Sequence, residues 1–465
     1  MRFTSTRGGD TATFSQAVIK GLAGDGGLFV PETLPDISLY LKRWHGLPYT
    51  ELASSFLSLF ATDIPRDELN HCVELAYSDF PDPITPAPLV KLSDNLHVME
   101  LFHGPTLAFK DFALQLLGQF YGRHIRDTGH SLNILGATSG DTGSAAIHGM
   151  LKHPGVHSFI LYPEGCIAEL QERQIACTGS PFVHPFAIKG SFDDTQDIVK
   201  QIFGDATFSS THSLAAVNSI NIARLLAQCV YYLHAALKLE ASEDNPLEFI
   251  VPTGNFGNVL AGWMLSRMGV RGMRFCVATN VNAVVSNFFK TGEYRPGTVT
   301  PSHAPSMDIQ QASNLERWLW WHFNGNGARV REIMTTLQHD GKFVLDEIPE
   351  NTDMIRAISC DNAGIETWIR RAWLEKGYLA DPHTACAFAA VREDTRGVIL
   401  ATAHPAKFPE VIASVTGQFP QHPSLEILKK RTVIKHILPA DVEAVKIAIN
   451  SHCKNLNYYH HGNNR

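Results

Sequence analysis

The sequence predicts an α/β protein built from open, mostly parallel β-sheets. A segment typical of a strand, a loop containing Gly or Pro, and a segment typical of a helix recur in this order along the chain. The 465 residues are enough for several domains of about 150 residues each. The 18% charged and 44% hydrophobic residues are typical of a compact chain rather than a disordered one.

The first two strand–loop–helix units lie in the N-terminal third of the chain. Residues 96–102 read as a strand, and the apolar spacing predicts a helix over 107–121. Residues 132–135 read as a second strand, followed by the loop 136–143 and a helix over 144–151.

Two further units follow in the C-terminal half. The strand 247–251 leads through the loop 252–257 to a helix over 258–268. The strand 397–400 leads through 401–405 to a helix that begins near residue 406. Additional strands are expected at 157–161 and 275–278, and Ser191, three residues before Asp194, is expected to cap a helix.

A proline-rich connector divides the chain. Residues 79–88 contain four prolines, a pattern typical of an extended linker. We therefore predict a domain boundary here, with an N-terminal domain over residues 1–82 and the rest of the chain over 83–465. Residues 290–360 show little periodicity, and the aromatic residues at 318–323 within them are interpreted as core or interface packing.

Composition excludes several classes of protein. The formal charge of -7 lacks the basic excess of a nucleic-acid-binding protein. The polar start and the absence of about 18 consecutive apolar residues predict no secretory signal and no membrane span. The eight cysteines form no C-x-x-C pair and no cluster at metal-ligand spacing. We therefore expect reduced thiols, no bound metal and a cytoplasmic location.

The loops after the predicted strands are the expected ligand sites, because ligands of open α/β sheets bind at the carboxyl ends of strands. The glycine-rich loop 253–258 precedes a helix and could hold a phosphate on backbone N–H groups, or it could be a plain turn. It matches neither of the usual nucleotide-binding glycine patterns. The hydroxyl-rich loop 138–142 could hold a carboxylate, or its hydroxyls could simply cap the following helix.

Lys110 is the most suggestive single residue. It lies between two phenylalanines at the start of a predicted helix, where burial and the helix dipole would disfavour the ammonium form, although Asp111 also allows a plain surface pair. One apolar-flanked lysine, one phosphate loop and one carboxylate loop together are what pyridoxal phosphate (PLP) and an amino-acid substrate require. Thr402 could face the pyridine nitrogen of PLP, or it could be an ordinary loop hydroxyl.

Several motifs in order resemble those of the threonine synthase family, in its bacterial and fungal branch. They are His103-Gly-Pro-Thr-Leu-Ala-Phe-Lys-Asp111, Ala137-Thr-Ser-Gly-Asp-Thr-Gly143, Val217-Asn-Ser-Ile-Asn221 with Arg224, Pro252-Thr-Gly-Asn-Phe-Gly257 and Thr402-Ala-His-Pro-Ala-Lys-Phe408. The resemblance also includes the N-terminal Ser5-Thr-Arg-Gly8 and Asp25-Gly-Gly-Leu-Phe29. It covers about residues 1–440 and is weakest between 320 and 375.

The resemblance implies a PLP enzyme of the tryptophan-synthase-β-like fold (PLP fold type II) that converts O-phospho-L-homoserine and water to L-threonine and phosphate. It also implies that residues 83–465 form a catalytic region of two α/β lobes. By this resemblance Lys110 is the catalytic lysine that binds PLP. The other residues carried over for the cofactor are Phe109, Gly254, Asn255, Phe256, Gly257, Asn258 and Thr402. Those carried over for the substrate are Thr138, Ser139 and Thr142 at its carboxylate, and Asn218, Ser219 and Arg224 at its phosphate.

The resemblance further implies a small-molecule substrate and a monomer or homodimer, and the composition predicts no nucleic-acid or membrane partner. Position 258 is Asn where relatives often have Asp, and Ala283 stands where an Asp is expected. Two alternatives stay open. The first is a phospholyase that releases 2-oxobutyrate, ammonia and phosphate from the same substrate. The second is a phosphate-binding α/β protein that is non-catalytic or does not use PLP.

Overall fold

The computed structural model describes residues 1–153, 156–345, 354–393 and 396–462, with side chains as far as residue 453. The chain divides into two compact units. The first comprises Met1–Leu117 and Ser219–His422, and the second Gly118–Asn218 and Pro423–Arg465. This division falls inside one long helix and does not test the predicted boundary at residue 82, which stays a prediction.

The first unit is built on a six-stranded sheet of order β14-β11-β10-β15-β5-β4. All neighbouring strands are parallel except β4 and β5, which are antiparallel. The strands are β4 (Leu89–Lys91), β5 (Leu96–Glu100), β10 (Leu247–Pro252), β11 (Met273–Thr279), β14 (Ile355–Ser359) and β15 (Gly397–Ala401). All six residues of β10 are buried, as expected for a central strand covered on both faces.

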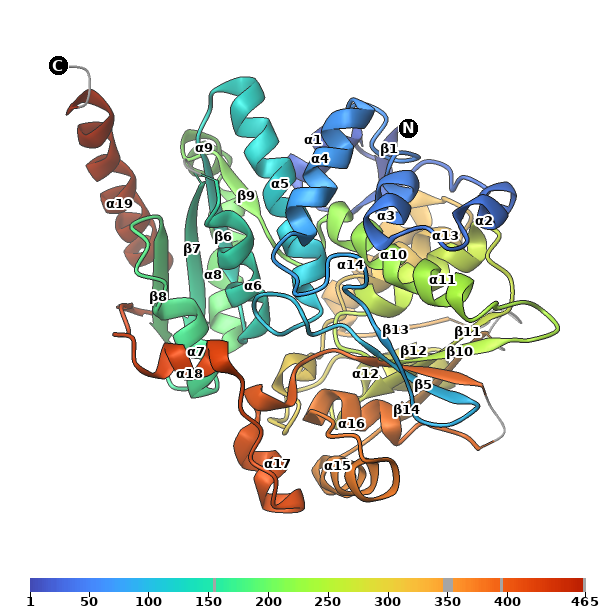
Figure 1. The fold of residues 1–465 in the computed structure, drawn as a ribbon. Coiled ribbons are helices and arrows are strands. Elements are labelled where there is room, and N and C mark those ends of the chain that lie inside the picture. The colour runs from blue at the N-terminus through green and yellow to red at the C-terminus, as the bar shows by residue number, and fades with distance from the viewer. Residues whose placement is uncertain (154–155, 346–353, 394–395, 463–465) are drawn as a thin grey trace. The chain divides into compact units, whose positions relative to one another are not determined.

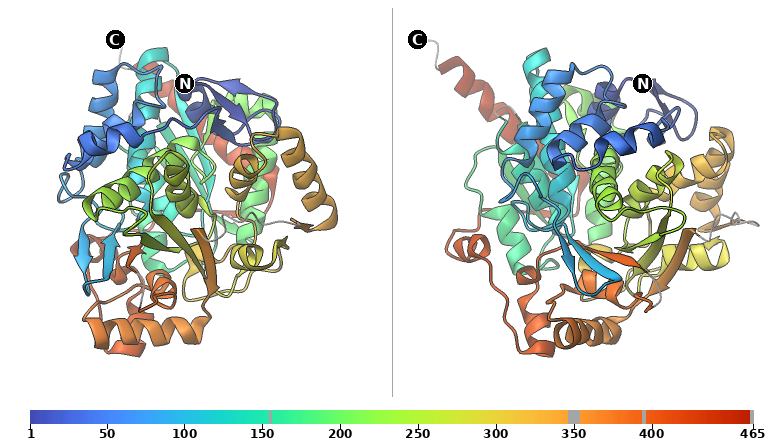
Figure 2. Two further views of the ribbon diagram at one scale, coloured as in Figure 1. Left: turned by 90° about the vertical axis from the view of Figure 1, so that its right-hand side faces the viewer. Right: turned by 45° about the vertical axis from the view of Figure 1, so that its right-hand side comes forward.

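Helices cover both faces of this sheet. Figures 1 and 2 show α10 and α11 on one side and α15 and α16 on the other. The helices of this unit after β4 are α5 (Lys110–Thr128, which continues into the second unit), α10 (Ile222–Lys238), α11 (Gly257–Arg267), α12 (Val284–Thr291), α13 (Leu315–His322), α14 (Gly327–Asp340), α15 (Asn362–Lys376), α16 (Pro382–Phe388) and α17 (Pro409–Thr416). Short elements are β12 (Glu293–Tyr294), β13 (Phe343–Val344), η1 (Pro305–Met307) and η3 (Pro405–Lys407).

The N-terminal segment of the first unit forms a small antiparallel sheet of order β2-β1-β3. Its elements are β1 (Phe3–Ser5), β2 (Thr11–Ala12), α1 (Phe14–Lys20), β3 (Phe29–Pro31), α2 (Ser38–Trp44), α3 (Tyr49–Leu57) and α4 (Arg66–Tyr77). Glu316 on α13 ties this segment to the rest of the unit, because it accepts hydrogen bonds from Thr6 Oγ1 at 2.6 Å and Arg7 Nε at 3.0 Å.

The second unit is a parallel five-stranded sheet of order β16-β8-β7-β6-β9. Its strands are β6 (Leu132–Ala137), β7 (Val156–Pro163), β8 (Val183–Lys189), β9 (Leu214–Ala216) and β16 (His436–Pro439), and its helices are α6 (Asp141–Met150), α7 (Glu169–Ala176), α8 (Phe192–Gly204), α9 (Ala206–Thr211), α18 (Pro423–Lys429) and α19 (Val442–Gly462).

Strand β7 shows how both faces of this sheet are buried. Phe159 and Leu161 pack in one apolar cluster with α8 and α19, whereas Ile160 and Tyr162 pack in another with α6 and α7. Successive side chains of a strand point to opposite faces, so a strand covered on both faces needs a continuous apolar run. The run Phe159–Tyr162 meets this requirement.

The predicted fold class is confirmed, and the local differences have physical causes. Helix α5 begins at Lys110 rather than at 107, because Leu107 has a positive φ of 62° and lies in a turn. Helix α6 begins at Asp141 rather than at 144, because Gly140 turns the chain with a φ of 135°, which favours glycine. The predicted Ser191 cap is present, with Ser191 and Asp194 bonded reciprocally. The helix expected from residue 406 is instead η3 followed by α17.

Two predicted absences can be compared with the described part of the chain. None of its helices has the length and apolar character needed to cross a bilayer. Among the same residues, no cluster of His, Cys, Asp and Glu has a geometry that could hold a metal ion.

Candidate active site

In the first unit, the sheet order places three predicted site segments side by side. Strand β15 lies between β10 and β5, all three parallel. Thr402 follows β15, the glycine-rich loop 253–258 follows β10, and the loop that leads to Lys110 follows β5. Because the carboxyl ends of parallel strands share one edge, the Thr402 loop lies between the other two.

The backbone around Lys110 is tied directly to Thr402. The Phe109 N–H donates to the Thr402 carbonyl at 2.9 Å, and Ala108 forms an antiparallel bridge with Ala403. Lys110 is the first residue of α5, and both Phe109 and Lys110 are half-buried. The predicted cofactor residues Phe109, Lys110 and Thr402 are therefore neighbours in space.

Asp111 has a structural role in the turn before Lys110. Its carboxylate is fully buried and accepts hydrogen bonds from the Thr106 N–H at 2.9 Å and the Thr106 hydroxyl at 2.8 Å. Gly104 packs against it so closely that an added Cβ would lie 2.5 Å from Asp111 Cβ. Asp111 is thus not the solvated surface partner of Lys110 that the sequence left open.

The glycine-rich loop ends in a left-handed turn that starts α11. Phe256, the N-cap, has a φ of 62°, and Gly257 is the first helical residue. The N–H groups in the first turn of a helix have no partner within the helix, and the helix dipole is positive there. The loop therefore has the geometry of an anion site.

Two tyrosines of α10 form hydrogen bonds with the Asn258 side chain. Its Oδ1 accepts the Tyr231 hydroxyl at 2.5 Å and the Tyr232 hydroxyl at 2.9 Å. Its Nδ2 is buried and has no hydrogen-bond partner among the described residues. An Asp could accept the same two hydroxyls, which explains why either residue suits this position.

The segment 302–310 packs against Gly254. A Cβ on Gly254 would lie 2.9 Å from Ile309 Cδ1 and 3.2 Å from the Ser306 carbonyl oxygen, so the close approach requires glycine. Sequence reasoning left this segment unassigned, because it contains only a three-residue helical turn and no hydrophobic period.

A buried polar network holds that segment. Asp308 accepts hydrogen bonds from Asn280 at 2.7 Å, Asn282 at 3.0 Å and the Ser302 hydroxyl at 2.7 Å. Burial raises the pKa of the Asp308 carboxyl, and these hydrogen bonds oppose the rise. Ala283 is the N-cap residue of α12 and makes no side-chain capping bond. Asn280 and Asn282 of the loop after β11 are therefore held by the Asp308 carboxylate.

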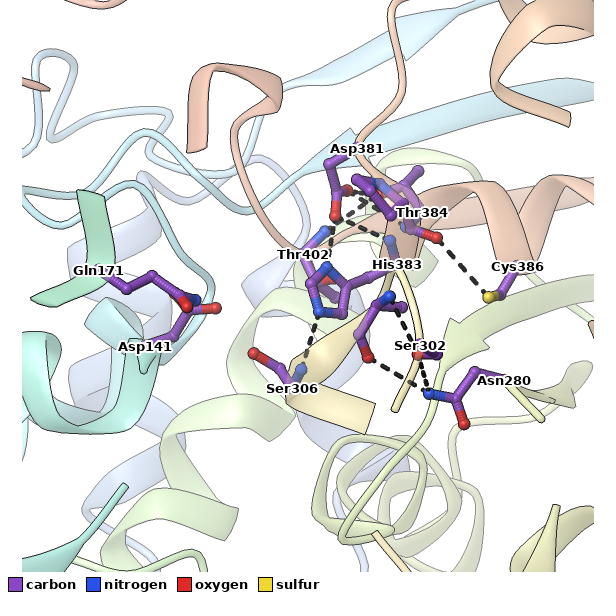
Figure 3. Close-up of polar contacts among 12 residues, drawn as sticks. Asp141, Gln171, Asn280, Ser302, Ser306, Asp381, His383, Thr384, Cys386 and Thr402 are labelled. Carbon is purple, nitrogen blue, oxygen red and sulfur yellow. Dashed lines mark hydrogen bonds and ion pairs between the residues drawn. The ribbon is translucent and has the colours of Figure 1, made fainter. Parts of the chain in front are cut away.

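Asp381 and His383 at the start of α16 connect this segment with Thr402. Figure 3 shows the His383 ring between Asp381 and Ser306. The Ser306 N–H donates to His383 Nε2 at 3.1 Å, so His383 Nδ1 carries the proton and donates to Asp381 Oδ2 at 2.6 Å. Thr384 Oγ1 donates to Asp381 and accepts the Thr402 N–H at 3.4 Å. Sequence analysis missed these residues, whose only signal is an Asp before Pro at a helix start.

The predicted phosphate segment of the substrate begins α10. Ser219 and Arg224 lie on either side of Asn221, whose side chain accepts the Ala223 N–H as the N-cap. Arg224 is 4% exposed. The Ser219 carbonyl accepts a hydrogen bond from Asn314 Nδ2 at 3.2 Å, and the same amide donates to the Asn255 carbonyl at 3.2 Å. Asn314 thus joins this segment to the glycine-rich loop.

The second unit carries the predicted carboxylate loop at the end of β6. The Thr138 hydroxyl accepts the N–H groups of Gly140 at 3.0 Å and Gly143 at 2.9 Å, so it orders the loop itself. Ser139 and Thr142 are half-buried. Gln171 Nε2 donates to Asp141 Oδ1 at 2.9 Å, as Figure 3 also shows. Asn218 ends this unit, where its Oδ1 would lie 3.7 Å from a Cβ on Gly136.

Burial keeps the His404 side chain, near Thr402, uncharged at neutral pH. Desolvation lowers the pKa of His404 to about 4, assisted by the nearby His422 and His103. The neutral ring accepts the Ala406 N–H on Nδ1 at 3.1 Å and so caps η3. The turn after Thr402 therefore depends on an uncharged His404 at neutral pH.

Comparison with known proteins gives a consistent assignment along the chain. Residues 2–77 match the family described as threonine synthase N terminus, residues 80–336 match pyridoxal-phosphate dependent enzyme, and residues 384–449 match threonine synthase, C-terminal. A threonine synthase of Pseudomonas aeruginosa is 40% identical over 97% of this chain and 98% of its own. The chain belongs to the threonine synthase family.

Further members of the family agree in sequence and in fold. The threonine synthase of Schizosaccharomyces pombe is 40% identical over 88% of each chain. The crystal structure of PLP-bound threonine synthase from Brucella melitensis has a TM-score of 0.91 and 38% identity, covering 97% of this chain and 99% of that one. The family is PLP-dependent, and its members are lyases of threonine biosynthesis, as the sequence motifs predicted.

The residues present fit PLP. The glycine-rich loop offers backbone N–H groups and the buried, unpartnered Nδ2 of Asn258 to a phosphate. Lys110 offers a primary amine for the aldehyde, and Thr402 offers a hydroxyl for the pyridine nitrogen. The sheet order places the Thr402 loop between the other two, as one elongated ligand that touches all three would require.

Proposed function

We propose that this chain is a threonine synthase, which uses PLP to convert O-phospho-L-homoserine and water to L-threonine and phosphate. The observation that carries the proposal is the placement of the Lys110, Thr402 and glycine-rich loops on three adjacent parallel strands, in a chain matched along its length by threonine synthases. The substrate is a small molecule, as for the family.

Lys110 is proposed as the catalytic residue. When bound, PLP supplies an electron sink for the negative charge that develops at the substrate carbons. The Lys110 Nζ would hold the cofactor at rest and, once released, remove protons from Cα and then Cβ of the substrate. Its position at the start of α5, in a turn fixed by Asp111 and by the bond between Phe109 and Thr402, limits the positions that this amine can reach.

The remaining site residues are proposed to bind and orient. Gly254, Asn255, Phe256, Gly257 and Asn258 would hold the cofactor phosphate, and the Thr402 hydroxyl would donate to a ring nitrogen that stays unprotonated. Thr138, Ser139 and Thr142 are proposed for the substrate carboxylate. Since the Thr138 hydroxyl is used within its loop, Ser139 and Thr142 are the better candidates for direct contact.

Asn218, Ser219 and Arg224 are proposed for the substrate phosphate. A guanidinium can make paired hydrogen bonds to phosphate oxygens, and a nearly buried one does so with little competition from water. The same group would retain the released phosphate while water adds at Cβ.

The test begins with the purified protein and its Lys110→Ala variant. The wild type should show the visible absorbance of protein-bound PLP and should form threonine and phosphate in equal amounts from O-phospho-L-homoserine. The variant should lose both properties. Lys200→Ala, which removes an exposed lysine of α8, is the matched control and should keep both.

Product analysis separates the proposal from its competitors. Accumulation of 2-oxobutyrate and ammonia instead of threonine would identify a phospholyase. No absorbance band after addition of PLP would leave a phosphate-binding protein that does not use this cofactor, and an active Lys110→Ala variant would remove Lys110 from its role.

We further propose that the protein works in the cytoplasm as a monomer or homodimer. No disulfide joins cysteines among the described residues, which agrees with a reducing compartment. Light scattering should give about one or two times 51.3 kDa, and fractionation of cells should recover the protein with cytoplasmic markers.

A further inference from the structure

Arg317 on α13 is a fully buried cation with an unusual set of partners. Its Nε donates to the Phe29 carbonyl at 3.0 Å, one terminal nitrogen donates to Asn314 Oδ1 at 2.5 Å, and the other donates to the Ile220 carbonyl. No salt bridge joins its guanidinium to a carboxylate among the described residues, although the charge of the adjacent Glu316 opposes the lowering of the Arg317 pKa by burial. The hydrogen bonds of the guanidinium therefore go to neutral oxygen atoms.

The bond from Arg317 determines how the Asn314 amide is oriented. Because Oδ1 accepts from Arg317, Nδ2 must face the carbonyl oxygens of Ser219 and Asn255, each 3.2 Å away. A flipped amide would place an oxygen against both carbonyls. The backbone N–H of Asn314 also donates to the Asn255 carbonyl at 3.2 Å.

Asn255 and Ser219 belong to the two segments proposed for phosphates. Asn255 lies in the glycine-rich loop, and an added Cβ on the adjacent Gly257 would lie only 3.0 Å from Asn314 Nδ2. Ser219 precedes the α10 N-terminus, and Ile220, bonded to Arg317, follows it directly. One guanidinium and one amide thus join both segments.

The buried charge of Arg317 also supports a link between the two phosphate segments. Burial lowers the pKa of Arg317 to about 9, so the group remains charged at neutral pH. Burying a charge is costly, and the carboxylate of Glu316 offsets only part of that cost, because the pKa of Arg317 stays below its usual value. Two phosphate groups, each received by a segment tied to Arg317, would add further negative charge near it.

We propose that Arg317, acting through Asn314, is a positioning residue that joins the loop for the cofactor phosphate to the segment for the substrate phosphate and favours anions at both. This inference rests on the proposed function for the identity of the two phosphates. It predicts that the two sites are coupled, because one amide holds both.

Asn314→Asp is the decisive variant, because it keeps the shape of the side chain. The new carboxylate still accepts from Arg317 but cannot donate to Ser219 or Asn255, and it neutralises the buried charge. We expect the dissociation constant of PLP, titrated into the PLP-free full-length protein, to rise about tenfold or more. We expect a similar rise for inorganic phosphate, measured by calorimetry on the PLP-loaded protein.

Asn326→Asp is the matched control. Asn326 is the exposed N-cap of α14 and accepts the Arg329 N–H at 3.1 Å, which a carboxylate does equally well. This variant should bind PLP and phosphate as the wild type does. If Asn314→Asp also binds both with wild-type constants, the proposal is overturned.

Arg317→Lys and Arg317→Met separate charge from shape. If charge at this position favours anions, the Lys variant should bind phosphate more tightly than the Met variant, and equal binding by the two would count against that part of the proposal. Should either fail to fold, Asn314→Asp still decides the matter.

Steady-state kinetics give a readout that general destabilisation would not produce. Weakened phosphate binding should raise KM for O-phospho-L-homoserine with a smaller change in kcat. If the wild type makes no threonine, the proposed function fails, whereas the PLP and phosphate constants of the variants still test the role of Arg317.

Discussion

Lowering the pH should decrease the stability of the second unit, because His184 is buried in it. The His184 ring on β8 stacks on Phe159 with 4.7 Å between ring centroids and packs at a tilt against His452 of α19 with 4.2 Å between centroids. It also shares a 3.4 Å hydrogen bond with His157. Burial, followed by the neighbouring His452, His157 and His436, lowers the pKa of His184 from 6.5 to about 3. The folded unit therefore holds this ring neutral.

The sign and size of the effect follow from proton linkage. Below about pH 6.5 the unfolded chain binds a proton at His184 that the folded chain does not bind, so stability falls with pH until the folded pKa near 3 is reached. Between pH 7 and pH 5 this single site should remove about 2 kcal/mol of unfolding free energy. That corresponds to a factor of about 30 in the unfolding equilibrium.

Amide hydrogen exchange measured by mass spectrometry is the suitable assay. All seven tryptophans lie in the first unit, so tryptophan fluorescence would not report on this change. Protection of amides in β7 and β8, corrected for the intrinsic pH dependence of exchange, should fall by at least about 30-fold from pH 7 to pH 5, because His184 alone accounts for that factor.

His184→Phe keeps a ring at this position but removes the titrating group, and it should reduce the loss by about 2 kcal/mol, while the remaining histidines of the unit with lowered pKa values, such as His153, still contribute. His130→Phe, at an exposed histidine of the same unit, should leave the loss unchanged. An equal loss of protection in wild type and His184→Phe would refute the assignment to His184.

Three further predictions concern the first unit. Gly254→Val should raise the dissociation constant of PLP, measured by titration, about tenfold or more, because the valine side chain would clash with the Ser306 carbonyl oxygen. An unchanged dissociation constant would contradict the close approach of these two segments. Asp111→Asn should lower the unfolding free energy in urea by about 2 kcal/mol, because charge-assisted bonds to Thr106 are lost, and a neutral result would exclude that role. His383→Phe should cost about 1–3 kcal/mol in the same assay, because the Ser306 N–H loses its acceptor; wild-type stability would show that water replaces the ring.

The sequence predicted helices and strands best where burial imposes a regular pattern of apolar residues. Strand β7 and the strands before each site loop were identified, because a strand covered on both faces needs an apolar run. Helix starts were predicted less well. Leu107 and Gly140 have positive φ values, and such turns depend on contacts such as that of Asp111 with Thr106.

Much of the candidate site was also predicted from the sequence. Lys110, Thr402 and the loop 253–258 carry local signals, namely a lysine flanked by apolar residues and a hydroxyl or glycines at the end of a strand. The carried-over roles of these residues and of the substrate residues stay predictions that the proposed experiments test. Asp308, Asp381, His383 and Arg317 carry no such signal, because each acts through partners that are distant in sequence.

The α/β class and the residue types able to perform the chemistry can be read from the sequence, since hydrophobic period and residue type are local properties. Which of those residues meet depends on how the segments pack. The strand order β10-β15-β5 joins loops near residues 254, 402 and 110, and Asn314 joins the first of these to Ser219. Strand pairing and buried hydrogen bonds depend on the packing of segments far apart along the chain, which no local pattern specifies.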